Sequence, residues 1–193
     1  ELDDRDSFGE LQLRLTLRNG VVSSVEAYTD ALDTTLPDRL CALLIGVRYD
    51  PADIANALMK GGTEAREIAA KMIGERYMDL IENARRELHS MPELAFCEEK
   101  TKRFIRRFIE EHTSLELHDM GSWLYAAHRE GAGKTVAVRA DFDAVPCDGA
   151  ARHLCGHDGH TAALLGLALL LEGKPVGKNV ILLFQPAEET GAG

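Results

Sequence analysis

The sequence predicts an α/β protein in two parts: a small α+β domain made of a hairpin and helices, then an α/β domain with a mostly parallel sheet. Alternating leucines before an Asn-Gly pair indicate the hairpin. Helical and strand patterns then alternate along the second part, which favours helices packed on a parallel sheet. A charged, alanine-rich stretch joins the parts and ends near Gly74, so we expect domains at residues 1–73 and 74–193.

The composition excludes several classes of protein. Of the 193 residues, 45% are hydrophobic and 28% charged, as in ordinary globular domains. The net charge of -10 lacks the basic surface that nucleic acids or anionic membranes would require. The longest apolar stretch is about half a membrane span, and four cysteines without framework spacing favour a reducing cytoplasm. Because the chain begins with Glu1, we expect a fragment or a processed product.

The first part is predicted from local patterns. Leucines alternate with polar residues over 11–17, which indicates a half-buried strand, and a return strand over 21–25 follows the turn Asn19-Gly20. Helical spacing over 40–47 indicates one helix, and Asp50-Pro51 opens a second. We find no catalytic grouping in this part.

The second part alternates between helices and strands. A buried helix over 161–172 and a continuous apolar strand over 179–185, covered on both faces, are its clearest elements. The remaining elements are expected as helices over 78–94 and 97–112, with strands over 115–117, 123–127 and 135–139.

The stretch 153–160, HLCGHDGH, packs one cysteine, three histidines and one aspartate into a short segment. The thiolate of Cys155 and the imidazole of His157 could both bind a borderline ion such as zinc, with Asp158 holding a histidine in the right tautomer. The alternative is a polar loop with incidental histidines. The density of the cluster and the later acidic pair favour the metal site.

Further acidic residues follow predicted strands, at the ends where open α/β sheets bind ligands. Asp141 and Asp143 follow one strand, although a simple turn explains them equally well. Glu188 and Glu189 follow another, where a solvated turn is the less favoured alternative. In an extended segment adjacent glutamates point to opposite sides, so one could bind a metal and the other act as general base.

Two families are similar to parts of this sequence. Residues 8–70 resemble the small accessory domain at the carboxyl end of lipoate-protein ligases, whose lipoate and ATP sites lie in another domain, so no binding residue is carried over. RRELHSMPELAFCEE, VRADFDAVP, HLCGHDGHTAALLGLALLL and FQPAEE resemble the metallopeptidase and amidohydrolase family of aminoacylases, hippurate hydrolase and the hydrolases of indole-acetyl amino acids.

The second resemblance implies a catalytic domain that binds one or two divalent ions, zinc or manganese. It implies metal ligands at Cys155, His157 and Glu189, a general base at Glu188, and a ligand-orienting role in catalysis for Asp143. The supporting residues are expected to be Asp141, Asp158 and His160.

The chain departs from this family in two places. The loop 147–152 is shorter than in most relatives, and the further histidine ligands and the lid or dimerisation domain that follow the glutamate pair are missing. We therefore expect a truncated catalytic domain with about three ligands and weak metal binding. Exposed hydrophobic faces should also promote association into homo-oligomers.

The resulting hypothesis is a metal-dependent hydrolase of amide bonds in N-acyl amino acids or related small amides and peptides. A competing hypothesis is a ligase accessory or interaction domain fused to a degenerate hydrolase remnant. A third joins the two halves: since lipoate is attached to lysine through an amide, the protein could be a lipoyl-amide hydrolase.

Overall fold

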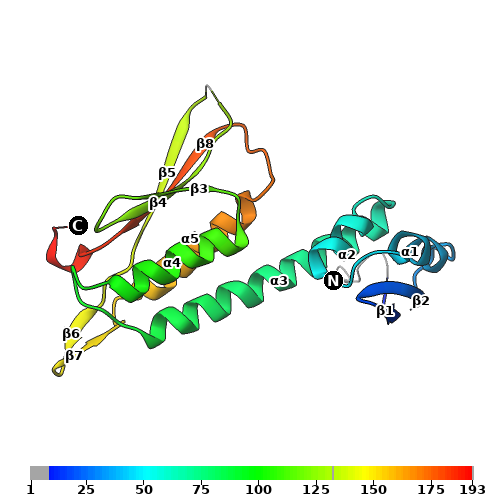
Figure 1. Cartoon of the computed structure of the whole chain (residues 1–193), viewed down its shortest axis with the longest axis horizontal. Coiled ribbons are helices and arrows are strands. Elements are labelled where there is room, and N and C mark those ends of the chain that lie inside the picture. The colour runs from blue at the N-terminus through cyan, green and yellow to red at the C-terminus, as the bar shows by residue number, and fades with distance from the viewer. Residues whose placement is uncertain (1–8, 132, 193) are drawn as a thin grey trace, which may run out of the picture. The chain divides into compact units, whose positions relative to one another are not determined.

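The computed structural model describes residues 9–131 and 133–192, and it divides into two compact units, Glu1–Arg76 and Tyr77–Gly193 (Figure 1). The division falls inside the helix α3 (Thr63–Ser90). The sequence suggested two helices separated near Gly74, but Gly74 lies within α3. A single glycine costs a helix only about 1 kcal/mol, and the alanines, glutamates and arginines around it favour the helix. The domain boundary after residue 73 remains a prediction.

The first unit contains the predicted hairpin. β1 (Leu11–Arg18) pairs antiparallel with β2 (Val21–Thr29), and both turn residues have positive φ, 53° at Asn19 and 75° at Gly20. This is the backbone that an Asn-Gly pair adopts readily. One face of β1, which carries Leu11, Leu13 and Leu15, packs on the core formed by α1 (Leu36–Leu44), α2 (Pro51–Leu58) and the start of α3.

The sheet of the second unit has the strand order β3-β4-β8-β5. Its strands are β3 (Glu116–Asp119), β4 (Leu124–His128), β8 (Asn179–Gln185) and β5 (Thr135–Asp141). The sheet is mixed rather than mostly parallel, because only β5 and β8 run parallel. The connection between β3 and β4, residues 120–123, is too short for a crossover and forces an antiparallel return. A small hairpin of β6 (Val145–Cys147) and β7 (Ala150–Arg152) lies outside this sheet.

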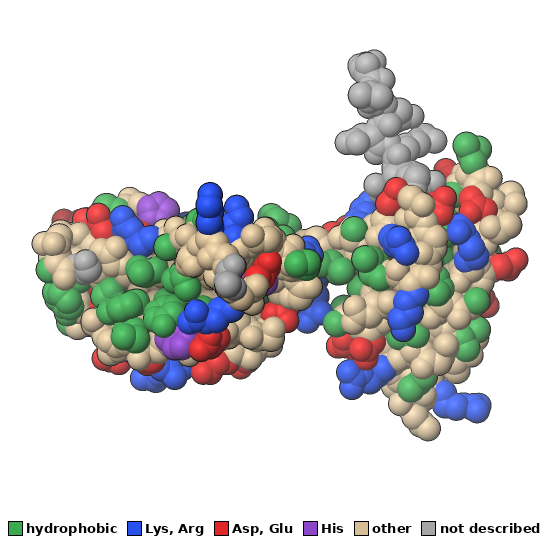
Figure 2. Space-filling view, turned by 90° about the horizontal axis from the view of Figure 1, so that it is seen from above, with side chains coloured by type: hydrophobic (Ala, Val, Ile, Leu, Met, Phe, Trp, Pro, Cys, Tyr) green, Lys and Arg blue, Asp and Glu red, His purple; other side chains and the backbone are tan. Residues whose placement is uncertain are grey.

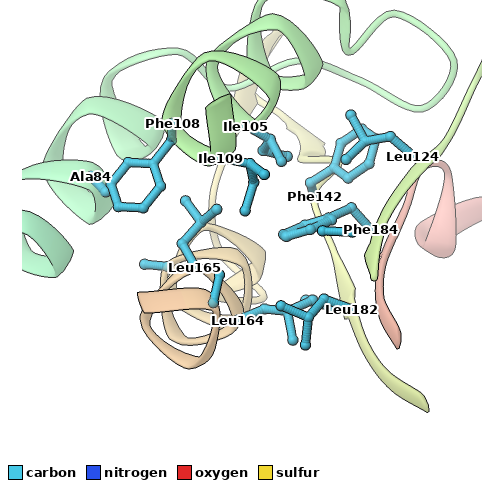
Figure 3. Packing of buried hydrophobic residues seen from close by; sticks show 14 of the residues in the cluster. Ala84, Ile105, Phe108, Ile109, Leu124, Phe142, Leu164, Leu165, Leu182 and Phe184 are labelled. Carbon is cyan, nitrogen blue, oxygen red and sulfur yellow. The ribbon is translucent and has the colours of Figure 1, made fainter. Parts of the chain in front are cut away.

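Two helices cover one face of the sheet (Figure 1). They are α4 (Glu99–His112) and α5 (His157–Leu171). Figure 3 shows Ile105 and Ile109 of α4 and Leu165 of α5 converging on Phe184 of β8. The α/β class is confirmed by this packing of helices on a sheet.

The other face of the sheet is uncovered within the described part of the chain. Along β8, Val180, Leu182 and Phe184 are buried, whereas Ile181 and Leu183 are only partly buried. The sequence indicated a strand covered on both faces, and this was wrong because α4 and α5 lie on the same side (Figure 1). None of the helices formed by the described residues has the length and apolarity to cross a bilayer.

We predict that Leu165→Ala lowers the free energy of unfolding of the second unit by about 2–5 kcal/mol, because it leaves a cavity where Leu165 is 0% exposed. Leu154→Ala is the matched control at a leucine that is 66% exposed, and it should change stability by less than about 0.5 kcal/mol. Urea denaturation followed by tryptophan fluorescence measures both, since Trp123 is the sole tryptophan. Equal effects of the two substitutions would contradict the packing.

Glu130 gives a prediction of pH dependence. Its carboxylate accepts hydrogen bonds from the backbone N–H groups of Val176 and Gly177 and contacts Nε2 of His128 at 2.7 Å. The bond from Val176, followed by that from His128, lowers the pKa of Glu130. A lowered folded-state pKa stabilises the fold above about pH 5, and this contribution is lost as the pH falls below about 4.

Glu130→Gln should therefore destabilise the protein at neutral pH and much less in acid. Urea midpoints at about pH 7 and about pH 3.5 measure the difference. Glu110→Gln, on the exposed side of α4, is the control and should show no such change with pH. A gap between Glu130→Gln and the unaltered protein that widens in acid would contradict the assignment.

Candidate metal centre

His157 begins the helix α5 and is almost fully buried, with 4% exposure. The helix starts earlier than residue 161, where the sequence pattern suggested, so His157, Asp158 and His160 lie in its first turn. Gly156 precedes it with a φ of 81°, a conformation that glycine adopts without strain. The backbone thus turns sharply into α5 and directs the imidazole into the unit.

Asp143 fixes the orientation of this imidazole. Nδ1 of His157 lies 3.0 Å from Oδ1 of Asp143 and 3.0 Å from its backbone oxygen. Both partners are acceptors, so Nδ1 carries the proton and Nε2 keeps a free lone pair. The second carboxylate oxygen of Asp143 accepts a hydrogen bond from the backbone N–H of Glu189 at 3.1 Å. Asp143 therefore joins the end of β5 to both later segments of the site.

Three carboxylates surround the free nitrogen of His157. Its Nε2 lies 3.5 Å from Glu189, 3.7 Å from Glu188 and 3.8 Å from Asp141. Cys155, His157 and Glu189 each offer one potential ligand atom, and these atoms lie within 4.8 Å of one another. A hydrogen bond to Glu189, first among several causes, raises the pKa of the exposed Cys155 thiol.

The glutamate pair is positioned by a turn rather than by an extended segment. Glu188 and Glu189 open the short 3-10 helix η1 (Glu188–Thr190), so the expectation that they point to opposite sides was wrong. Ala187 before them has a φ of 52° and is fully buried. Its N–H donates to the buried carboxylate of Glu98 at 2.9 Å. This turn brings both glutamates toward His157.

Asp141 lies at the edge of the cluster. Its carboxylate accepts from Arg139 at 2.7 Å and contacts Nδ1 of His160 at 2.6 Å. Burial acts to raise the pKa of Asp141, but the hydrogen bond of His160 and the nearby His157 outweigh it and hold the pKa below its ordinary value. Asp141, His157 and His160 form a second group whose potential ligand atoms lie within 4.8 Å.

Asp158 has different partners from the other site residues. The buried carboxylate contacts Nδ1 of His89 at 2.8 Å and Nε of Arg85 at 3.2 Å. His89 was interpreted from the sequence as structural, and Arg85 and Glu98 were not singled out. An acidic residue directly before an amphipathic helix, as Glu98 is, carries no local signal that it will be buried against a distant turn.

The residues fit a divalent cation. A nitrogen, a sulfur and an oxygen donor meet within 4.8 Å, which matches the mixed ligand set of zinc sites. Carboxylates gathered around one neutral imidazole repel one another unless a cation lies among them. The hydrogen bond to Asp143 provides the second-shell support typical of metal-binding histidines.

Two family models match the chain. Residues 1–81 match the bacterial lipoate protein ligase C-terminus, and residues 137–193 match peptidase family M20/M25/M40. The chain is 39% identical over 129 residues to an N-acetylcysteine deacetylase of Bacillus subtilis (strain 168), a match that spans 58% of this chain and 33% of the relative. It is 37% identical over 127 residues to IAA-amino acid hydrolase ILR1-like 6 of Arabidopsis thaliana, which spans 58% of this chain and 27% of the relative.

A solved structure gives a similar result. The YXEP protein of Bacillus subtilis, described as a dinuclear metal binding peptidase from the M20 family, matches with a TM-score of 0.57 and 36% identity, over 62% of this chain and 38% of that one. The chain spans about a third of the length of the curated relatives it matches. The second unit thus carries part of a peptidase family M20/M25/M40 domain, in a chain that begins with a segment of the lipoate protein ligase C-terminal family.

Proposed function

We propose that this chain contributes the metal-binding part of a hydrolase that cleaves amide bonds in N-acyl amino acids or related small amides and peptides. The observation that carries the proposal is the free Nε2 of buried His157, held by Asp143 and surrounded by Cys155, Glu188 and Glu189. Relatives named as deacetylases and amidohydrolases of acylated amino acids support the substrate class.

We assign the metal ligands to Cys155, His157 and Glu189, with zinc or manganese as the ion. Thiolate and imidazole suit zinc, and the carboxylate is compatible with either ion. Asp143 orients His157, and its bond to the backbone N–H of Glu189 positions that ligand as well. Removing Asp143 should therefore disturb two ligands at once.

Glu188 is assigned as the general base. Its side chain is 41% exposed, so it can reach a water molecule beside the cluster and accept its proton during attack on an amide carbonyl. A divalent ion held by the three ligands supplies Lewis acidity, which polarises the carbonyl and eases deprotonation of water. Asp141 and His160 support the cluster from its edge, and Asp158 steadies the start of α5 through His89.

The other partners follow from charge and surface chemistry. We infer that neither nucleic acid nor a membrane is a partner, because the net charge is -10. Cys41, Cys97, Cys147 and Cys155 are free, which supports a cytoplasmic location. The uncovered sheet face supports association between copies.

A second candidate function rests on the match of residues 1–81 to the lipoate protein ligase C-terminus. In that case the chain is an accessory or interaction module, and the hydrolase part is inactive or acts on lipoyl amides. The two candidates differ in whether amide hydrolysis is found and on which acyl group.

The first test is metal binding. We predict that calorimetric titration with Zn²⁺ gives one bound ion per chain, that His157→Ala abolishes binding, and that Asp143→Asn weakens it about 10- to 100-fold. With Co²⁺, Cys155→Ser should remove the thiolate-to-metal absorption band. Cys97→Ser is the matched control, since both cysteines are exposed in the second unit. Equal losses from both cysteine substitutions would contradict the assigned ligand.

The second test is hydrolysis. With Zn²⁺ or Mn²⁺ we expect release of free amine from N-acyl amino acids, and Glu188→Gln should lower kcat at least about 100-fold while metal affinity is retained. The neighbouring Glu189→Gln should instead weaken metal binding. Lipoyl-lysine belongs in the same panel. A metal-loaded chain that releases no amine would exclude hydrolysis and favour the accessory function, and cleavage of lipoyl-lysine alone would identify a lipoyl-amide hydrolase.

A further inference from the structure

The uncovered face of the sheet in the second unit carries a row of aromatic rings. Tyr125 stacks on His118 with ring centroids 4.4 Å apart and on Trp123 with centroids 5.8 Å apart. Tyr125 lies opposite Leu183 of β8, on the face away from α4 and α5. Figure 2 shows hydrophobic side chains gathered on the side of this unit seen from above. The row presents aromatic surface that the described part of the chain does not bury.

A cavity of about 480 Å³ lies at one end of this row. Phe96 and Trp123 provide aromatic walls, Leu183 contributes to the apolar lining, and Ser122 and Gln185 add uncharged polar groups. No charged side chain is among the lining residues. The volume lies within the range of about 300–1,000 Å³ of small-molecule sites. The cavity therefore suits an uncharged, apolar group.

The cavity shares a wall with the candidate metal centre. Pro186 and Ala192 line it, and Glu188 and Glu189 lie between them on the same short segment. The opposite wall is linked to this segment too, because Phe96 lies two residues before Glu98, whose carboxylate accepts the N–H of Ala187. A ligand that fills the cavity is thus close in structure to the proposed general base.

We propose that this cavity holds the acyl group of the substrate and that it selects aromatic or other bulky apolar acyl groups over acetyl. The inference rests on the proposed amide hydrolase function, and it adds the substrate class. The carboxylate of an acylated amino acid finds no cation in the cavity, so the acyl end is the part that fits. A flat ring can stack against Trp123 and Phe96, whereas an acetyl group leaves most of the volume empty.

The test uses Trp123, which is the sole tryptophan of the chain and lines the cavity. Its emission is followed while the full chain is titrated with hippurate or N-acetylglycine, which share a carboxylate and an amide and differ only in phenyl against methyl. We expect a saturable change with hippurate and none with N-acetylglycine at the same concentrations. Equal responses to both compounds, or a response to neither, would overturn the proposal.

A matched pair of variants locates the binding. Phe96→Ala should weaken hippurate binding about tenfold. Tyr49→Ala should leave it unchanged, and it removes an aromatic residue that is 58% exposed, as Phe96 is, from the first unit. Circular dichroism checks that both variants fold. An unchanged affinity in Phe96→Ala would overturn the assignment of the cavity.

The titrations are made with a chelator present, so that they are independent of metal binding. If hippurate binds to the metal-free chain and no amine is released when metal is added, the proposed hydrolysis fails and the cavity assignment stands. If amine is released and the emission of Trp123 does not respond to hippurate, the cavity assignment fails and the hydrolase function stands.

Discussion

The candidate centre depends on the contact between the buried carboxylate of Asp143 and Nδ1 of His157, at 3.0 Å. A fully buried carboxylate is costly unless its oxygens are paired, and Asp143 pairs both, one with His157 and one with the N–H of Glu189. Three segments distant in sequence, the ends of β5 and β8 and the start of α5, are joined in this way. The same contact sets the tautomer that leaves Nε2 of His157 free for a cation.

The segment after β8 is the second constraint. Ala187 adopts a left-handed conformation that non-glycine residues rarely adopt, and the packing around it must offset that cost. Glu98 contributes by accepting its N–H at 2.9 Å. One side of the resulting turn presents Glu188 and Glu189 to His157, and its flanking residues Pro186 and Ala192 line the aromatic cavity. A single local conformation thereby connects the proposed chemistry to the proposed acyl specificity.

The two units are stabilised by separate cores with different architectures. The first buries one leucine face of a hairpin against α1 and α2, and the second buries one face of a mixed sheet against α4 and α5. Both groups of potential ligand residues found among the described residues belong to the second unit. The metal chemistry can therefore be attributed to that unit's own sheet and helix termini.

The sequence by itself determined the elements whose signals are local. The Asn19-Gly20 pair specifies the hairpin because its backbone tolerates positive φ, and the apolar runs specify α5 and β8. The chemistry of Cys155 and His157 was evident because metal-site residue types are dense in 153–160.

Only the tertiary structure decided which residues meet. The pairing of β4 with β8 makes the sheet mixed, the buried turn at Ala187 brings the glutamates together, and Asp158 pairs with His89 across 69 residues. Hydrophobic periodicity reports which face of one element is buried, and it carries no information about the partner that buries it. Those partners are selected by contacts between distant segments, which exist only once the chain has folded.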